Sequence, residues 1–552
     1  PRRGLAATLL LLAVAALLAL HPAGPARAGT IAVTTTADEL NSDGDCSLRE
    51  AIQAANTDTD VDACDDTADP DVITLPAGTY TLALAGADDA NAQGDLDILE
   101  DLTIQGAGAG STVIEACTVS QLAADCASSG GTGVQDRVLH VVSGTVTISG
   151  VTIRHGRVVL FGQGGGILNE GTLTLAASIL SSNYADSDGG GLYSDGATAT
   201  LSDTVVRDNR AEFSGGGISN GGTLTVTGST LRGNEVGFDG GGLYNGFSGT
   251  ATFSDTTVEA NTANDGGGIY NDGTLTLARS TLSGNNAGRG GGLFNTFDGT
   301  ATLVNSTVSG NTAVIGGGGV GGGIRNSSGT LRAAFVTITG NSTNGTGGGL
   351  WDGSNAAQLR GVILAGNTAS LGGADCNGTP ATADYTLVQD GTFCTLPVGA
   401  TGLQTGVDPL LGPLQANGGP TQTHALSLGS PALDAVPAAQ CTWDDDGDPG
   451  TANVPLPADQ RGVPRPQDGN GDGTAACDLG AFELQPAPTP TPTPSATPAA
   501  TPAPAATPTP AGIRLPETGS GGAAGGLAAV PAALLAGALL LAGGALALRR
   551  AR

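Results

Sequence analysis

Apolar and polar residues alternate in short runs along most of the chain, and the runs return at a regular interval. A Gly-Gly-Gly triplet followed by Ile or Leu recurs, with the apolar residue at Ile167, Leu192, Ile218, Leu243, Ile269, Leu293, Ile324 and Leu350. Successive members of this series lie 24 to 31 residues apart. Each interval holds three short alternating segments separated by Gly, Asn and Asp, and none has the length or the 3.6-residue period of a helix. The pattern predicts three short β-strands in every repeat.

Repeats of this length cannot bury an apolar face alone, so they must stack on similar neighbours. Stacked coils whose strands lie about 4.8 Å apart form parallel sheets around a thin apolar core. The predicted fold is therefore all-β, a parallel β-helix over residues 96–395 with short capping regions before and after it. A leucine-rich repeat has a similar period, but the L-x-x-L-x-L spacing and the helical half of that repeat are missing from this sequence.

Asparagine recurs at two positions of the repeat. One column consists of Asn169, Asn220, Asn245, Asn271, Asn295 and Asn326. The other consists of Asn183, Asn209, Asn234, Asn261, Asn285, Asn311, Asn341 and Asn367. Stacked amides can hydrogen-bond along a fibre or solenoid axis. We interpret both columns as structural ladders at turns, because Asn tolerates left-handed backbone, rather than as a row that binds sugars.

The repeats, of which residues 266–285 (GGGIYNDGTLTLARSTLSGN) are typical, resemble the right-handed parallel β-helix of pectin-lyase-like proteins. They are also similar to the GGA[I/L/V]-plus-Asn repeats of polymorphic bacterial surface proteins. Right-handed coiling is implied by this resemblance and by the usual handedness of parallel crossovers.

Both flanks of the repeats carry recognisable motifs. Residues 46–51 (CSLREA), within an N-terminal cap at 29–95, match the CSLREA motif that begins many bacterial secreted β-helix proteins. Ser47 and Glu50 fit a capping box on a short helix that places Leu48, Ile52 and Ala55 on one face. Residues 396–484, with DPLLGPL at 408–414 and DLGAFE at 478–483, resemble the choice-of-anchor C-terminal region, which varied anchoring tails follow.

The two ends of the chain predict export and surface attachment. Residues 1–28 have the charged start, the apolar run and the Ala-Arg-Ala site of a signal peptide. A Pro/Thr-rich linker at 485–514, expected to be an extended polyproline II segment, precedes a hydrophobic membrane segment at 520–548 and a basic tail at 549–552. Between them stand Leu515, Pro516, Glu517, Thr518 and Gly519. This order resembles the LPXTG sorting signal of sortase substrates, which implies cleavage after Thr518 and attachment of that residue to the cell wall. A plain transmembrane tail is the alternative.

The eight cysteines all lie outside the Gly-Gly-Gly repeats. An even number in an exported chain indicates disulfides rather than a zinc site. We expect each cysteine to pair with its sequence neighbour, one of many possible connectivities, and so to staple the ends of the solenoid. The expected pairs are Cys46–Cys64, Cys117–Cys126, Cys376–Cys394 and Cys441–Cys477.

Charge narrows the range of partners. The chain carries 21 basic and 51 acidic residues, a net charge of -30, and no lysine. Nucleic acids and anionic membranes need clustered Lys or Arg, whereas the arginines here are scattered singly along the sequence. We therefore expect no nucleic-acid partner.

Enzymes with this fold cleave acidic polysaccharides, and their chemistry needs a cluster of acidic or basic catalytic residues. His140, His155 and His424 are isolated in the sequence, and Arg154-His155-Gly156 is the best candidate, although a solvent-facing strand end explains it more simply. Residues 56–58 (NTD) match one fragment of a polygalacturonase site, but the other parts of that site are missing. The sequence therefore predicts that the protein is not an enzyme.

Calcium is the one cofactor that the sequence suggests. Asp468, Asn470 and Asp472 repeat the first half of an EF-hand loop, but the twelfth position is Leu479 instead of the bidentate Glu. A second acidic run nearby contains Asp444, Asp446 and Asp448. We therefore consider a looser calcium site, with solvated turn residues as the alternative. Asp188, Asp239 and Asp265, before three glycine triplets, are also interpreted as turn residues.

These observations favour a wall-anchored or membrane-tethered surface protein that acts as an adhesin or as a stalk binding extracellular glycans or matrix. The alternatives are a structural surface-layer protein without a specific ligand and a pectin-lyase-like polysaccharide lyase or hydrolase. Phe247, Phe297 and Trp351, which we place on longer turns, favour glycan binding, because sugars stack on aromatic rings.

Overall fold

The computed structural model describes residues 29–486, except 67–69, 87, 121, 123–125, 128–129, 315–317 and 444–452. The predicted signal peptide, almost all of the Pro/Thr-rich linker, the sorting motif with its hydrophobic segment and basic tail, and Asp444, Asp446 and Asp448 lie outside the described residues. No helix in the described part of the chain has the length and apolarity needed to cross a bilayer.

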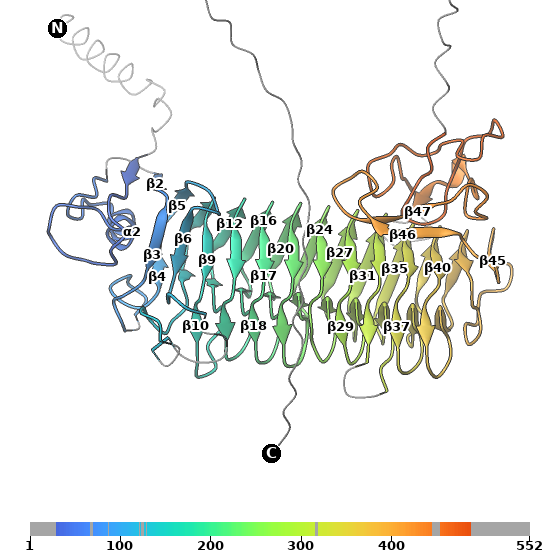
Figure 1. The fold of residues 1–552 in the computed structure, drawn as a ribbon, viewed down its shortest axis with the longest axis horizontal. Coiled ribbons are helices and arrows are strands. Elements are labelled where there is room, and N and C mark those ends of the chain that lie inside the picture. Colours follow the sequence, from blue (N-terminus) through green and yellow to red (C-terminus); the bar gives the residue numbers. More distant parts are fainter. Residues whose placement is uncertain are drawn as a thin grey trace, which may run out of the picture. The chain divides into compact units, whose positions relative to one another are not determined.

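Across the described residues, the strands stack into three long parallel sheets of a solenoid (Figure 1). Each coil contributes one strand to sheet 1, the next to sheet 2 and the next to sheet 3. Sheet 1 comprises β4 (Leu96–Ile98), β7 (Leu139–Val141), β11 (Ile167–Asn169), β15 (Leu192–Ser194), β19 (Ile218–Asn220), β23 (Leu243–Asn245), β26 (Ile269–Asn271), β30 (Leu293–Asn295), β34 (Ile324–Asn326), β38 (Leu350–Asp352) and β42 (Cys376–Gly378).

Sheet 2 contains the longer strands, most of which start with Thr. It comprises β1 (Thr30–Ala32), β2 (Asp71–Leu75), β5 (Leu102–Gly106), β8 (Thr145–Ser149), β12 (Thr172–Ala176), β16 (Thr198–Ser202), β20 (Thr223–Thr227), β24 (Thr250–Ser254), β27 (Thr274–Ala278), β31 (Thr300–Val304), β35 (Thr330–Ala334), β39 (Gln358–Arg360) and β43 (Thr382–Asp384).

Sheet 3 follows after a sharp corner in each coil. It comprises β3 (Gly78–Thr81), β6 (Thr112–Glu115), β9 (Thr152–Arg154), β13 (Ile179–Ser181), β17 (Val205–Arg207), β21 (Thr230–Arg232), β25 (Thr257–Glu259), β28 (Thr281–Ser283), β32 (Thr307–Ser309), β36 (Thr337–Thr339), β40 (Ile363–Ala365), β44 (Leu387–Val388) and β45 (Gln404–Thr405).

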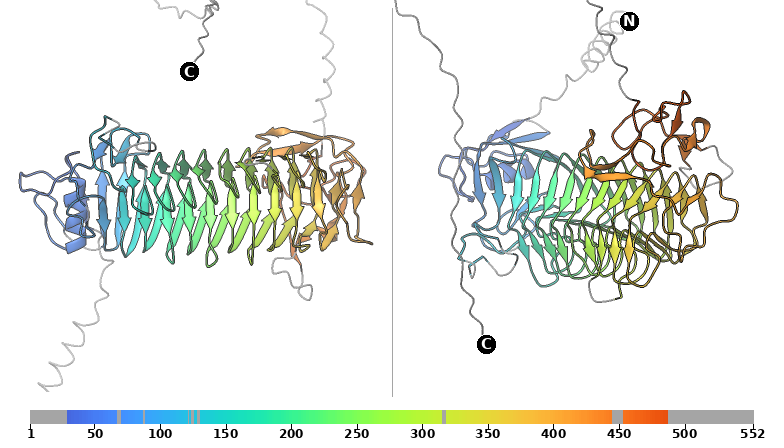
Figure 2. Two further views of the ribbon diagram at one scale, coloured as in Figure 1. Left: turned by 90° about the horizontal axis from the view of Figure 1, so that it is seen from below. Right: turned by 45° about the vertical axis from the view of Figure 1, so that its right-hand side comes forward.

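Two-residue strands complete many coils. They form one short sheet of β10 (Arg157–Val158), β14 (Tyr184–Ala185), β18 (Arg210–Ala211) and β22 (Glu235–Val236), and another of β29 (Asn286–Ala287), β33 (Thr312–Ala313), β37 (Ser342–Thr343) and β41 (Thr368–Ala369). The views in Figure 2 show the coils stacked in sequence order. The predicted parallel β-helix is therefore confirmed.

The core is a set of apolar columns, one residue per strand and coil. Ile218, Leu243 and Ile269 are adjacent in register and fully buried. In the five-residue strands of sheet 2 from β8 to β35 the second and fourth residues point inward, as Leu173 and Leu175 do in β12. Side chains alternate between the two faces of a strand, so the alternation in the sequence fixes which residues form the core.

The glycine triplets allow neighbouring coils to approach closely. A Cβ on Gly242 would lie 2.7 Å from the carbonyl oxygen of Gly268 in the next coil. That oxygen accepts the backbone N–H of Leu243 at 3.1 Å, so it cannot move away without breaking the ladder between the coils. Glycine is required here for close approach of two backbones.

Both asparagine columns form buried ladders. Nδ2 of Asn245 donates to Oδ1 of Asn271 at 2.8 Å, and Nδ2 of Asn261 donates to Oδ1 of Asn285 at 3.0 Å. The expected reason for these asparagines is wrong, since none of them has left-handed backbone. In the second column the residue before each Asn has positive φ instead, as Ala260 and Gly284 do. The amide is selected because it bonds to the coil above and the coil below.

The N-terminal region begins the solenoid earlier than predicted. β1, β2 and β3 already pair within sheets 2 and 3, so the coils start before residue 96. Helix α2 (Leu48–Thr57) has the predicted capping box of Ser47 and Glu50 and contacts β2 and β4. Asn56 donates to the carbonyl of Asp97 and accepts the N–H of Leu99, so it covers the free edge of β4.

The C-terminal region does not close the end of the solenoid as predicted. Residues after β45 fold back and pack along the outer side of sheet 3, as Figures 1 and 2 show. This region contains β46 (Leu411–Gln415), β47 (Thr423–Leu426), β48 (Val436–Pro437), the 3₁₀ helix η1 (Ala438–Gln440), β49 (Thr442–Trp443), β50 (Val454–Pro455) and β51 (Ala476–Cys477). Its apolar residues share a second core with outward-facing Val304, Phe335 and Ile363 of the solenoid.

The eight cysteines form four disulfides, which join the four pairs of sequence neighbours. Cys46–Cys64 brackets α2, and Cys441–Cys477 lies within the C-terminal region, where it links the end of η1 to β51. The cross-links therefore hold the segments that flank the repeats, where coil stacking gives less support.

Candidate functional site

The outer face of sheet 1 carries a column of large side chains. The middle residue of each three-residue strand points outward, and the coil register places these residues directly beside one another. We call the following set the aromatic column: Tyr193, Tyr244, Tyr270, Phe294, Arg325 and Trp351. The chain has only six Tyr, ten Phe and two Trp, so this gathering is not a consequence of abundance.

Ring contacts run along the column. The Tyr244 and Tyr270 rings are stacked with centroids 5.4 Å apart, and Phe294 meets Tyr270 edge-on at 5.2 Å. The Arg325 guanidinium lies between two rings, 4.4 Å from the centroid of Phe294 and 5.1 Å from that of Trp351. The column therefore forms a nearly continuous row of ring contacts across several coils, in which Phe294 is buried and the other rings are half-buried.

Arg325 has unused hydrogen-bonding capacity. Its Nε and Nη1 atoms are buried and have no hydrogen-bond partner, and Nη2 lies 3.5 Å from Oγ of Ser327. Burial lowers the pKa of Arg325 from its ordinary value. The unpaired N–H groups of Arg325 are buried, so they could bind a hydroxyl or carboxylate oxygen of a ligand only after the flanking rings shift.

A recess opens between two members of the aromatic column, where the outward-facing residue of the intervening strand is small. Ser219 lies between Tyr193 and Tyr244 in register, and a cavity of about 260 Å³ occupies this position. Asp188, Asp195 and Phe247 also line the cavity. Burial, reinforced by Asp195 and Asp188, raises the pKa of the Tyr193 hydroxyl to about 12, so this hydroxyl stays protonated. Two rings flanked by carboxylates and a phenol match the apolar faces and hydroxyl edges of a sugar.

Other aromatic residues border the same face. Phe247 and Phe297, on the turns that leave β23 and β30, are 73% and 65% exposed. Phe213 and Phe238, on the turns that enter β19 and β23, stack at 5.7 Å. The expected turn position is wrong for Trp351, which lies within β38 and is half-buried. Its strand position makes it part of the column.

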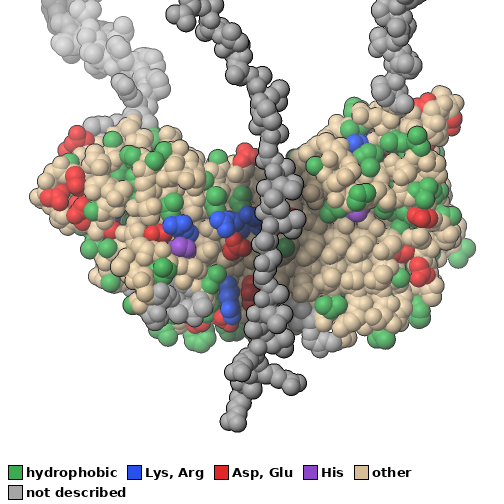
Figure 3. Space-filling view, in the orientation of Figure 1, with side chains coloured by type: hydrophobic (Ala, Val, Ile, Leu, Met, Phe, Trp, Pro, Cys, Tyr) green, Lys and Arg blue, Asp and Glu red, His purple; other side chains and the backbone are tan. Residues whose placement is uncertain are grey.

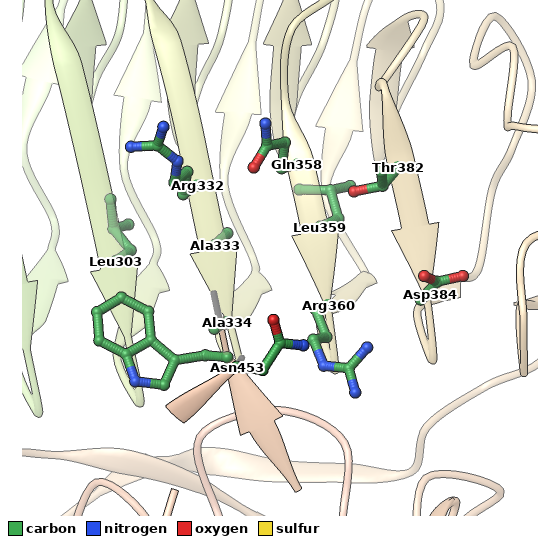
Figure 4. Close-up of a pocket in the computed structure, with 11 residues that line it drawn as sticks. Leu303, Arg332, Ala333, Ala334, Gln358, Leu359, Arg360, Thr382, Asp384 and Asn453 are labelled. Atoms are coloured by element: carbon green, nitrogen blue, oxygen red, sulfur yellow. The ribbon is translucent and has the colours of Figure 1, made fainter. Parts of the chain in front are cut away.

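A second recess lies between sheet 2 and the C-terminal region. Its volume is about 390 Å³, and strands β35, β39 and β43 supply Arg332, Arg360 and Asp384, while Trp443 and Asn453 come from the C-terminal region (Figure 4). Arg360 is held there by the carbonyls of Gln440 and Thr442. Nε of Arg332 is buried without a hydrogen-bond partner. This recess is suited to a small anionic group, which Arg332 would pair beside the Trp443 ring.

Arginines that are separate in the sequence come together on sheet 3. Arg207 is in register with Arg232 in the next coil and with Ser181 in the previous coil. Arg154 is in register with Ser181, one further coil back. Figure 3 shows blue side chains gathered on this face beside red ones. Arg154 pairs with Glu115 at 2.7 Å and Arg207 with Asp208 at 2.6 Å. These arginines are therefore not scattered in the folded structure as expected. Acidic partners offset much of their positive charge.

None of the three histidines in the described part of the chain is isolated. His155 is not solvent-facing as expected, because Nδ1 bonds the carbonyl oxygen of Cys117 at 2.8 Å and its side chain is mostly buried. Burial raises the pKa of Glu115, but hydrogen bonds from His155 and Arg154 outweigh burial and lower it overall. His424 binds Oγ of Ser309 and attaches the C-terminal region to sheet 3. His140 contacts the carboxylates of Asp89, Asp97 and Glu170.

Asp468, Asn470 and Asp472, which were expected to bind calcium, lie in one loop and accept its backbone N–H groups, whereas Asp444, Asp446 and Asp448 lie outside the described residues. Both carboxylate oxygens of Asp468 accept backbone N–H groups of the same loop, from Gly471, Asp472 and Gly473. Oδ1 of Asn470 accepts the N–H of Asp472. Among the described residues, the groups of three ligand-type side chains that do converge are Glu39–Asp43–Asp45 and Asp89–Asp97–His140. Sequence reasoning missed both groups.

The aromatic column was also missed as a unit, although a signal for it exists. In many repeats the residue directly after Gly-Gly-Gly-Ile/Leu is Tyr, Phe or Trp. Asp188, Asp239 and Asp265, interpreted as turn residues, precede the triplets and pair by single bridges with neighbouring coils. They therefore form an acidic border on the side of sheet 1 where the chain enters it.

No protein-family model matches the chain, and neither does any curated protein sequence. Among solved structures, the chain is similar to pectate lyase Pel9A, with 14% identity and a TM-score of 0.42 over 83% of this chain and 98% of that one. It is also similar to the A-modules of the Azotobacter vinelandii mannuronan C-5 epimerases AlgE4 and AlgE6, each at 15% identity. AlgE4 has a TM-score of 0.34 over 61% of this chain and 97% of that one, and AlgE6 has 0.30 over 67% and 97%.

Proposed function

We propose that this protein is an exported surface protein whose solenoid binds an extracellular glycan along the aromatic column. The observation that carries the proposal is the run of rings from Tyr244 through Tyr270 and Phe294 to Trp351, with Arg325 between the last two. Coils repeat about every 4.8 Å, close to the length of a sugar unit in an extended chain, so the half-buried rings of Tyr244 and Tyr270 can meet successive sugars, whereas Phe294 is buried. The Tyr193–Tyr244 recess would hold one sugar more deeply.

The proposal favours binding over cleavage. A polysaccharide lyase or hydrolase needs a base or an acid pair directed at one point of the bound chain. The aromatic column instead offers rings, the recess carboxylates and the unpaired N–H groups of Arg325 spread over several coils. Such a surface suits an adhesin or a stalk that holds a polymer. The LPETG motif, the flanking linker and sortase processing would supply attachment to the cell wall.

The test is a glycan-array screen followed by affinity measurement on the purified protein. We expect saturable binding to a small set of glycans without release of reducing ends or unsaturated products. Tyr244→Ala and Tyr270→Ala should each weaken the affinity roughly two- to twelvefold, since one ring contact contributes about 0.5–1.5 kcal/mol. Parallel measurements with EDTA show whether a metal contributes.

Trp443→Ala is the matched control. This half-buried ring belongs to the C-terminal region and lines the other recess, between that region and sheet 2. Loss of binding in the tyrosine variants but not in Trp443→Ala supports the aromatic column. The reverse result would move the glycan site to the Arg332 recess. Product release would establish an enzyme, and no binding in any screen would leave a structural surface-layer protein.

A further inference from the structure

A histidine and two aspartates meet at the N-terminal end of the outer face of sheet 1. Asp97 in β4 and His140 in β7 are partners in register, and Asp89 comes from the loop before β4. The side chains of Asp97 and His140 are 0% and 6% exposed, whereas that of Asp89 is 80% exposed. The cluster is therefore a buried pair of ligand atoms that opens to solvent on the Asp89 side.

The atoms that face one another are unsatisfied. Nδ1 of His140 lies 3.2 Å from Oδ1 of Asp97 and 3.7 Å from Oδ1 of Asp89. Oδ1 of Asp97 and Nδ1 of His140 are both buried, and neither has a hydrogen-bond partner. Burying a polar atom without a partner costs about 1–3 kcal/mol. Two such atoms 3.2 Å apart are satisfied either by a proton on Nδ1 or by a cation that both atoms bind.

The remaining hydrogen bonds leave these two atoms available. Nε2 of His140 lies 3.2 Å from Oε2 of Glu170, so the ring N–H can be placed there and the Nδ1 lone pair remains free. Oδ2 of Asp97 accepts the N–H of Asn91 at 2.9 Å, which fixes the carboxylate and leaves Oδ1 directed at the imidazole. A carboxylate on the distal ring nitrogen is the usual support of a metal-binding histidine.

We propose that Asp89, Asp97 and His140 bind one divalent transition-metal ion, with zinc as the ion to test. Ligands at ~2.0–2.2 Å from zinc, at the tetrahedral angle, lie roughly 3.3–3.6 Å from each other. The two distances from Nδ1, 3.2 and 3.7 Å, agree with this spacing. An imidazole nitrogen with two carboxylates suits zinc better than calcium, which takes six to eight oxygen ligands. Water would fill the open fourth position on the exposed side.

The surroundings favour a cation. Asp95 and Asp136 lie nearby, and the guanidinium of Arg137 is paired with Asp95 at 3.0 Å. The competing arrangement is a protonated His140 that pairs with Asp97 and Glu170 without a metal. The two arrangements differ in whether zinc is bound.

The test is a zinc titration of the purified full chain after chelator treatment, followed by calorimetry at pH 7.5. Excess calcium in the buffer occupies sites built from oxygen ligands alone. We expect one strong zinc site. His140→Asn and Asp97→Asn should each weaken its affinity for zinc more than 100-fold. X-ray absorption at the zinc edge should show one imidazole and oxygen ligands. His155→Gln is the matched control, because His155 is the other histidine near a carboxylate.

Asp89→Asn makes the test independent of folding. Its side chain is 80% exposed, so the substitution leaves the fold intact and should weaken zinc binding about tenfold. Absence of a strong zinc site in the wild-type chain overturns the proposal. So does a strong site that Asp89→Asn and His140→Asn leave unchanged. The proposal does not depend on glycan binding, because its readout is the metal alone.

Discussion

The side-chain amide of Asn261 donates a hydrogen bond to Oδ1 of Asn285, 3.0 Å away in the next coil. The same oxygen also accepts the backbone N–H of Asn261, and the Asn261 oxygen accepts both equivalent groups of Asn234. Each asparagine thus links the coil before it to the coil after it. The ladder continues from Asn183 to Asn367 and ends on Asp375.

Asn261→Ala should destabilise the solenoid by about 2–3 kcal/mol. The change leaves two N–H groups of Asn234 without an acceptor inside the protein, and unsatisfied buried groups are costly. Denaturant unfolding measures the loss. Asn264→Ala, at an exposed asparagine of the same coil, should change the stability by less than about 0.5 kcal/mol. Equal effects of the two substitutions would contradict the ladder's role.

The ladder and the core could be predicted from the sequence because a solenoid is nearly one-dimensional. Once the period is known, Ile218, Leu243 and Ile269 must be neighbours, and so must every other equivalent position. The Asp97–His140 pair could not be predicted in this way. The two residues are adjacent in register, but the coil between them is much longer than the others and lacks the glycine triplet.

The attachment of the C-terminal region could not be predicted either, although the sequence indicates which face of the solenoid is covered. Val304, Phe335 and Ile363 are apolar at outward positions, where earlier coils mostly have polar residues or Gly, and this indicates a covered face. Which segment covers that face depends on contacts more than a hundred residues apart, such as Thr307 with Gln460. No periodicity relates these residues.

Gln460→Ala should release the C-terminal region from sheet 3. Gln460 is fully buried, donates to Thr281 and Thr421, and accepts a hydrogen bond from Thr307 at 2.7 Å. Loss of these hydrogen bonds should weaken the attachment of the C-terminal region to sheet 3 by about 2–4 kcal/mol. Hydrogen exchange would then show faster exchange in residues 408–484, while the coils before residue 280 stay protected. Gln415→Ala, an exposed glutamine of the same region, is the control and should leave exchange unchanged.

Asp239→Asn should make the protein less sensitive to alkaline pH. Burial, with Asp265 adding to it and Arg289 opposing it, raises the pKa of Asp239 from its ordinary value to about 6. The folded state therefore binds this proton more tightly than the unfolded state does. The resulting stability is fully present below pH about 4 and is lost as the pH rises through about 6.

Because Asp239 is partly exposed, the loss should be about 1 kcal/mol after allowance for solvent screening. The Asn variant, which has no such loss, should equal the wild type at pH 4 and exceed its unfolding free energy by that amount at pH 8. Denaturant titrations at the two pH values give the difference. Asp65→Asn, at an exposed aspartate, should show no such trend. If Asp239→Asn does not raise the unfolding free energy at pH 8, burial does not raise the pKa of Asp239.

Gly242→Ala should disrupt the stacking of two coils although it adds a single methyl group. The added Cβ would lie 2.7 Å from the carbonyl oxygen of Gly268 and 3.1 Å from Nδ2 of Asn261. The oxygen belongs to the ladder of backbone hydrogen bonds, so relief of the clash must separate the coils, at a cost of about 2–3 kcal/mol. Gly110→Ala is the control, because a Cβ there meets nothing within 4 Å. If both variants melt at the wild-type temperature, close approach of the backbones does not explain why the triplet is glycine.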